Sequence, residues 1–136
     1  MPDSHLEVAV MTPSGQVHRV PCLIGLVGRD YLLELEIPPI GVRRIVDRDY
    51  FECLLHLRDE IEPLGYRLLV QGARRNAWPS GMLRDMGGGR KAYLLELGEH
   101  GVRPATVDIF EPAHVGDVVL ADEQRDFYKT WLDELG

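Results

Sequence analysis

The chain has 136 residues, of which 45% are hydrophobic and 27% are charged, and its formal net charge is −7. This size and composition are typical of one globular domain, residues 1–136, and exclude a disordered chain. The acidic balance argues against general nucleic-acid binding or attachment to anionic membranes, because those surfaces would repel the protein, but it permits a basic protein partner.

The N-terminal residues and the cysteines indicate where the protein resides. Asp3 and Glu7 lie near the start, and no long apolar run indicates a signal peptide or a membrane span. Cys22 and Cys53 lie in apolar surroundings without Cys-x-x-Cys spacing. Buried free thiols are therefore favoured over a disulfide, and we expect a cytoplasmic protein.

The first third of the chain predicts three strands. Residues 6–11 and 17–26 are apolar and flank a turn-rich segment, 12–15, so they are predicted to form a hairpin. Residues 31–37 alternate between apolar and acidic side chains, which is typical of an antiparallel strand with one solvent-facing side. The apolar members are Leu33, Leu35 and Ile37, and the acidic members are Glu34 and Glu36.

A helix is predicted over residues 48–62, with Asp47 as its N-cap and a stop at residues 63–65. Residues 66–73 then read as a strand that leads into a long connection, 74–91. The apolar stripe of the predicted helix over 48–62 comprises Phe51, Leu54, Leu55 and Ile61.

After the connection, the sequence predicts strands over 92–97 and 106–110, with loops over 98–104 and 111–116. Asp122 is predicted to cap a C-terminal helix in which Phe127, Trp131 and Leu135 recur every four residues, so this face must pack on something. The order of elements predicts an α+β domain, with a mostly antiparallel sheet of about five or six strands and two helices packed on one face.

The pentapeptide Tyr-Leu-Leu-Glu-Leu occurs at residues 31–35 and again at 93–97. A duplicated unit would need matching flanks, and the predicted helix over 48–62 has no equivalent after residue 97. We therefore interpret the two copies as strands in similar half-buried environments rather than as a duplication.

The connection over residues 74–91 is the candidate site. It carries five cations and one acid, a net +4, so the rest of the chain carries −11 to give the total of −7. Long connections on a rigid scaffold are common places for function, and consecutive glycines let a backbone approach another group closely. The residues expected to bind a ligand or partner are Arg74, Arg75, Trp78, Ser80, Arg84, Gly87, Gly88, Gly89, Arg90 and Lys91.

Two interpretations of these cations remain open. Clustered guanidinium groups and glycine amides can bind a phosphate or carboxylate, which predicts a small-anion or nucleotide site and leaves an enzymatic role open. The glycines match neither nucleotide-binding fingerprint, however. In the alternative, the arginines pair with the protein's own carboxylates and the glycines form a bulge or a mobile tip.

No residue is assigned to catalysis, a metal or a cofactor. Ser80 lies in Pro-Ser-Gly rather than Gly-x-Ser-x-Gly, which favours a turn serine. The histidines, at positions 5, 18, 56, 100 and 114, are never three or four residues apart, and no His-Cys ligand spacing occurs. The many carboxylates favour a solvated acidic face over paired acid and base groups. Binding is thus expected rather than catalysis.

A motif in the candidate site resembles one in small uncharacterised bacterial proteins. It comprises Trp78-Pro79-Ser80-Gly81-Met82, Arg84-Asp85-Met86-Gly87-Gly88-Gly89 and Ala92-Tyr93. The resemblance covers residues 72–97, and the helix over 124–132 is compatible with it. In size, acidity and α+β arrangement, these proteins are similar to immunity proteins of polymorphic toxin systems. The resemblance implies a cytoplasmic antidote that binds a toxin domain, and it supplies no catalytic residues.

Three hypotheses follow. The first is an acidic immunity-like inhibitor that neutralises a basic toxin domain by tight binding, with Trp78 and the arginines as anchors. The second is the small-anion or nucleotide-binding domain. The third is a structural dimer in which Phe127 and Trp131 pack across a two-fold axis.

Overall fold

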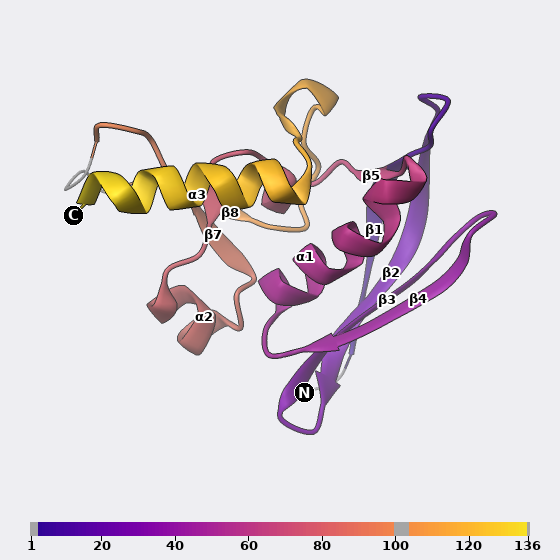
Figure 1. The fold of residues 1–136 in the computed structure, drawn as a ribbon. Helices are drawn as coiled ribbons and strands as arrows, with labels where there is room; N and C mark the ends of the chain where they lie inside the picture. Colours follow the sequence, from indigo (N-terminus) through magenta and orange to yellow (C-terminus); the bar gives the residue numbers. More distant parts are fainter. Residues whose placement is uncertain (1–2, 100–103, 136) are drawn as a thin grey trace.

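The computed structural model describes residues 3–99 and 104–135, and Figure 1 shows that they form an α+β fold with two antiparallel sheets. The larger sheet has the order β4-β3-β2-β1-β5 and comprises β1 (Ser4–Met11), β2 (Val17–Val27), β3 (Asp30–Ile37), β4 (Gly41–Asp47) and β5 (Arg67–Leu68). The smaller sheet has the order β6-β7-β8 and comprises β6 (Ala77–Trp78), β7 (Lys91–Leu94) and β8 (Thr106–Asp108). The predicted α+β class with mostly antiparallel strands is confirmed.

Three α-helices occur within the described residues: α1 (Tyr50–Ile61), α2 (Gly81–Gly87) and α3 (Ala121–Leu135). Short 3-10 turns occur at Glu62–Leu64, Gln71–Ala73 and Val115–Asp117. In Figure 1, α1 lies against the large sheet, whereas α3 lies beside the small sheet. No helix within residues 3–99 and 104–135 has both the length and the apolarity needed to cross a membrane.

The main core lies between α1 and the large sheet. As the alternation predicts, Leu33, Leu35 and Ile37 are buried on β3, while Glu36 is exposed. The buried face of α1 includes Phe51, Leu54, Leu57 and Ile61. Removal of these apolar surfaces from water is the main force that holds α1 on the sheet.

Several predicted boundaries were wrong. Asp49, not Asp47, caps α1: its Oδ1 accepts a hydrogen bond from the Glu52 amide at 2.8 Å. Asp47 instead ends β4, a strand that the sequence pattern did not predict. The predicted strand over 66–73 pairs with β1 only at Arg67–Leu68, because the chain then turns into the 3-10 turn Gln71–Ala73.

The C-terminal helix begins at Ala121, one residue before the predicted cap. Asp122 lies in its first turn and accepts a hydrogen bond from Arg125, while the Leu120 amide donates to Glu123 Oε1 at 3.1 Å. This reach-back from a glutamate in the first turn resembles half of a capping box. Residues 100–103 of the predicted loop over 98–104 lie outside the described residues, and His100 is one of them.

A buried polar network joins α1 to α3. Arg58 of α1 and Gln124 of α3 are both 0% exposed, and an Arg58 Nη1 donates to Gln124 Oε1. The other nitrogens of Arg58 donate to Glu62 Oε2 at 3.0 Å and to the Val119 carbonyl at 2.6 Å. Gln124 Nε2 donates to the carbonyls of Gly72 and Ala77. The network therefore fixes α3 against both α1 and the segment that enters the small sheet.

Both cysteines are free and buried, which bears on their reactivity. Burial raises the pKa of the Cys22 thiol to about 12, and burial together with the Asp47 carboxylate raises the pKa of Cys53 to about 12. In the unfolded chain, thiols ionise near pH 8.5. The native thiols thus stay protonated over a range in which the unfolded thiols have lost their protons.

We therefore expect the stability of the fold to decrease as the pH rises from about 8.5 toward 12, by up to ~1.4 kcal/mol per pH unit for each thiol. Urea unfolding at pH 8 and pH 10 measures this dependence. A Cys22→Ala variant should show a shallower decrease than the wild type. An unchanged slope in that variant would mean that Cys22 does not contribute.

Candidate functional site

The cationic connection is more ordered than the sequence indicated. It contains β6 and α2, and Ser80 caps α2 because its Oγ accepts a hydrogen bond from the Leu83 amide at 3.1 Å. Gly88 ends the helix in a left-handed conformation, with φ of 67°. The turn serine and the glycines thus define the two ends of a short helix, in keeping with their ordinary capping roles.

Gly88 and Gly89 bring the end of α2 against the start of α1. The Gly88 carbonyl accepts a hydrogen bond from the Tyr50 amide at 2.7 Å. A Cβ atom on Gly89, which has φ of +73°, would lie 2.9 Å from Asp49 Oδ1. A Cβ atom on Gly88 would lie 2.6 Å from the Tyr31 ring. These glycines are needed for close packing of the two helix ends.

Arg84 of α2 binds carboxylates of α1. Its Nη1 lies 2.8 Å from Asp49 Oδ2 and 3.2 Å from Glu52 Oε1, and its side chain is only 16% exposed. Its guanidinium carbon also lies 5.3 Å from the centre of the Phe51 ring and 6.0 Å from that of Trp78. The charge of Arg84 is therefore compensated within the chain.

The other cations are paired separately, although Arg74 and Arg75 line the same hollow. Arg90 Nε lies 3.1 Å from Asp108 Oδ2, and Arg75 Nη2 lies 3.7 Å from Glu123 Oε2. Arg74 donates to the Gln71 side chain at 3.0 Å, and Lys91 is exposed at the start of β7. Each of the four arginines named in the candidate site thus engages a partner from its own chain.

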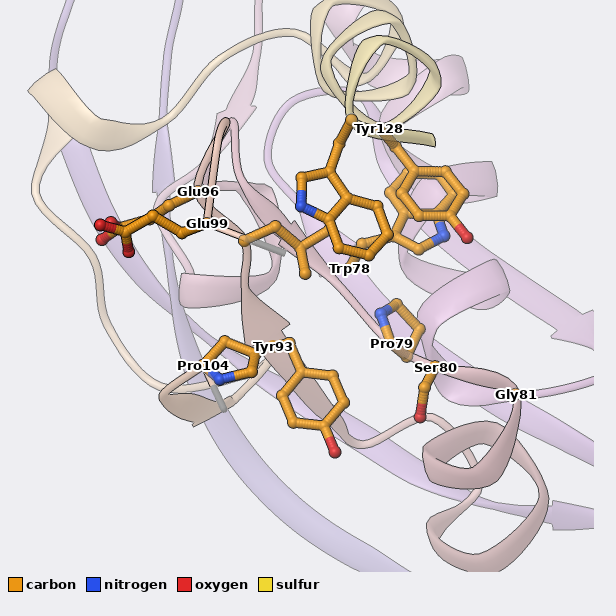
Figure 2. Close-up of a pocket in the computed structure, with 11 residues that line it drawn as sticks. Trp78, Pro79, Ser80, Gly81, Tyr93, Glu96, Glu99, Pro104 and Tyr128 are labelled. Atoms are coloured by element: carbon orange, nitrogen blue, oxygen red, sulfur yellow. The ribbon is translucent and has the colours of Figure 1, made fainter. Parts of the chain in front are cut away.

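One hollow beside this connection is an aromatic pocket of about 450 Å³ between α2, β7 and α3. Figure 2 shows Tyr93 between Pro104 and Ser80, with Trp78 and Tyr128 on another side. The lining residues are Trp78, Pro79, Ser80, Gly81, Tyr93, Leu95, Glu96, Glu99, Pro104, Tyr128 and Trp131, and we call this set the aromatic pocket.

A ladder of rings forms one wall of the aromatic pocket. The rings of Trp78 and Tyr128 are stacked, with centroids 4.4 Å apart and an interplanar angle of 10°. Tyr128 is also nearly parallel to Trp131, with centroids 6.2 Å apart, while Phe51 packs edge-on against Trp78 at 4.9 Å. Because Phe51 is fully buried, the ladder runs from the core to the pocket.

Two acidic side chains lie at one end of the aromatic pocket. Figure 2 shows Glu96 and Glu99 side by side, away from Ser80 and Gly81. A hydrogen bond with Glu96, and then repulsion from its charge, raise the pKa of the Glu99 carboxyl above its usual value. Two carboxylates held this close create a negative potential that favours a cation nearby.

The structure thus places two of the predicted site residues, Trp78 and Ser80, in the aromatic pocket, and two others, Arg74 and Arg75, in a second hollow of about 440 Å³. Sequence reasoning missed the pocket residues that come from β7, the chain after it, and α3. The aromatic residues of α3 were the sequence signal for this pocket, because Tyr128 and Trp131 both line it. Leu135, which belongs to the same repeating pattern, does not pack there and is 56% exposed.

Comparison with protein-family models gave no match, and comparison with curated proteins gave none either. Within residues 3–99 and 104–135, no group of three or more His, Cys, Asp or Glu side chains is arranged to hold a metal ion. The function is therefore inferred from the aromatic pocket and the charges around it.

Replacing Ser80 with alanine is expected to destabilise the protein by about 0.5–2 kcal/mol, because the Leu83 amide loses its cap. Ser80→Asp should retain most of the stability, since aspartate caps a helix equally well. Urea unfolding of the two variants measures this difference. Equal loss of stability in both would contradict a capping role.

Proposed function

We propose that this protein is an acidic binding protein that acts as an immunity-like inhibitor in the bacterial cytoplasm. In this proposal, it neutralises a cognate basic toxin domain by tight binding and performs no chemistry of its own. The observation that carries the proposal is the aromatic pocket, whose ring ladder and paired Glu96 and Glu99 open on the surface of a chain with a net charge of −7.

Tryptophan and tyrosine are the residue types that dominate the energy of protein interfaces. In the aromatic pocket they are held by neighbouring rings, so little side-chain entropy would be lost on binding. The acidic balance supports fast association with a basic domain through electrostatic steering. The resemblance of residues 72–97 to small bacterial proteins that are similar to immunity proteins favours the same class of partner.

The alternative function, binding of a small anion or nucleotide, receives less support. An anion at Arg84 would have to compete with Asp49 and Glu52, which lie 2.8 and 3.2 Å from the guanidinium. Arg90 is similarly paired with Asp108. An anion site normally presents donors that converge on one point and are free to bind it.

A growth-rescue screen tests the proposed function. The protein is co-expressed in bacteria with a panel of toxin domains that have basic active sites, and growth is compared with a strain that expresses each toxin alone. We expect rescue from at least one toxin and co-purification of the two chains. Failure to rescue growth or to bind throughout a broad panel would count against the proposal.

A thermal-shift screen with phosphate, nucleotides and sugar phosphates tests the alternative. Any ligand that binds the native state raises the melting temperature in a concentration-dependent manner. We expect no such rise. A rise that disappears in Arg84→Ala would instead support the anion-binding function, provided that this variant still folds.

A further inference from the structure

The chemistry of the aromatic pocket indicates which group of a partner it would receive. We infer that the pocket is a socket for one arginine side chain of the basic partner, with the guanidinium held between the aromatic wall and the carboxylates of Glu96 and Glu99. This inference rests on the proposed function, because the arginine is assigned to the partner that the protein neutralises.

The combination of walls selects a cation over other ligands. An anion would face the negative charges of Glu96 and Glu99, and a purely apolar group would contact the rings but gain nothing from those charges. A cation is attracted by both, because aromatic faces carry negative electrostatic potential. A positively charged group is therefore the ligand that interacts favourably with both the rings and the carboxylates of the pocket.

Arginine fits this arrangement better than lysine. The guanidinium is planar, so it can stack on an indole or phenol face while its edge donates to carboxylate oxygens. It is also more weakly hydrated than an ammonium, which lowers the free energy needed to remove it from water. A volume of about 450 Å³ leaves room for the aliphatic part of the side chain beside Leu95 and Pro104.

The aromatic wall is already in place before any partner binds. Trp78 is held between the buried Phe51 ring on one side and the stacked Tyr128 ring on another. The guanidinium of Arg84, fixed by Asp49, lies 6.0 Å from the Trp78 ring centre. A preorganised wall of this kind supports binding because few side chains need to be ordered by the partner.

The acidic end predicts a pH dependence. Glu96 and Glu99 interact closely, so the pKa of Glu99 is raised in the free protein. A guanidinium stabilises the ionised carboxylates, and its binding should therefore weaken as the pH falls and they become protonated. Two other charged groups face this segment: Arg74 lines an adjoining hollow with Glu96 and Glu99, and Glu134, near the end of α3, accepts a hydrogen bond from the Gly98 amide.

The chain offers a direct reporter, because it contains two tryptophans and both Trp78 and Trp131 line the pocket. We propose to titrate the protein with Nα-acetyl-arginine methylamide while tryptophan fluorescence is recorded. The neutral isostere Nα-acetyl-citrulline methylamide is titrated in parallel. We expect a saturable change for the arginine amide, with a dissociation constant of roughly 1–10 mM as for a single side chain, and no saturation for the citrulline amide.

A double variant, Glu96→Gln with Glu99→Gln, should weaken arginine-amide binding at least tenfold. Both residues are exposed, so the fold should be retained, and a thermal melt checks this. The matched control is Glu36→Gln with Glu111→Gln, which removes the same charge from exposed positions outside the pocket and should leave binding unchanged. Equal responses to arginine and citrulline amides, or equal binding by both double variants, would overturn the inference.

The outcomes separate this inference from the proposed function. Saturable binding of the arginine amide without rescue from any toxin would leave the socket intact and overturn only the inhibitor function. Growth rescue that is unaffected by the Glu96→Gln and Glu99→Gln changes, together with no response to the arginine amide, would overturn the socket and leave the inhibitor function standing.

Discussion

Replacing Arg58 with methionine is expected to lower the free energy of unfolding by about 3–5 kcal/mol, the largest effect of any single change considered for this protein. Arg58 is 0% exposed and donates to Glu62, Gln124 and the Val119 carbonyl. Without the guanidinium, the Glu62 carboxylate, whose side chain is 8% exposed, loses its cationic partner in a nearly dry environment.

Burial lowers the pKa of Arg58, while the neighbouring Glu62 opposes that effect. The residue nevertheless remains charged, because an arginine guanidinium does not lose its proton in proteins. Its removal therefore leaves Glu62 without its cation, although the Ala121 amide still donates to Glu62 Oε1 at 2.8 Å. It also removes a donor from Gln124 Oε1 and from the Val119 carbonyl, and each unsatisfied neutral group costs about 1–3 kcal/mol.

Arg125→Met is the matched control for Arg58→Met. Arg125 contacts Asp59 with two hydrogen bonds, of 2.8 and 2.7 Å, but its side chain is 37% exposed and that of Asp59 is 46% exposed. An exposed pair contributes about 0–1 kcal/mol, so this control should be close to the wild type. Urea unfolding measures both variants, and equal effects would contradict a special role for the buried network.

Gly89→Ala is expected to destabilise the protein by about 1.5–4 kcal/mol. A left-handed backbone costs an alanine about 1–2 kcal/mol, and disturbance of an N-cap costs a further 0.5–2 kcal/mol. Gly89 combines both effects, because its φ is +73° and a Cβ atom would lie 2.9 Å from the Oδ1 of Asp49 that caps α1. The Phe51 amide, 3.2 Å from the same Cβ position, restricts any shift.

The neighbouring Gly87 provides a control for this prediction. It lies in α2 without a positive φ, and a Cβ atom there would meet nothing within 4 Å. Gly87→Ala should therefore be neutral or stabilise the protein by up to ~1 kcal/mol. Thermal or urea unfolding of the two variants decides the matter, and a Gly89→Ala protein as stable as Gly87→Ala would refute the packing argument.

The parts of the fold that the sequence predicted well depend on local signals. The hairpin of β1 and β2 follows from a turn segment between apolar runs, and β3 follows from alternation. The strand β4 was missed because the arginines at 43 and 44 interrupt its pattern. Their pairing with β3, which places Arg43 opposite Leu35 and Arg44 opposite Glu34, depends on tertiary contacts.

The candidate site was only partly predictable for the same reason. Ser80 and Trp78 were identified because they lie in a segment of unusual composition. The partner of Arg84 is Asp49, which is 35 residues away, and the stacking partner of Trp78 is Tyr128 on the last helix. Such contacts arise when separate elements pack together, so residue spacing within one segment does not predict them.

Growth rescue by charge-reversed variants tests the central claim most directly, with a toxin domain that the wild type neutralises. One variant carries Glu96→Lys and Glu99→Lys in the aromatic pocket, and its counterpart carries Arg75→Glu and Lys91→Glu at exposed positions of the cationic connection. We predict that the first variant folds but no longer rescues growth, while the second still rescues. Rescue by the first variant and not by the second would contradict binding through the acidic aromatic pocket.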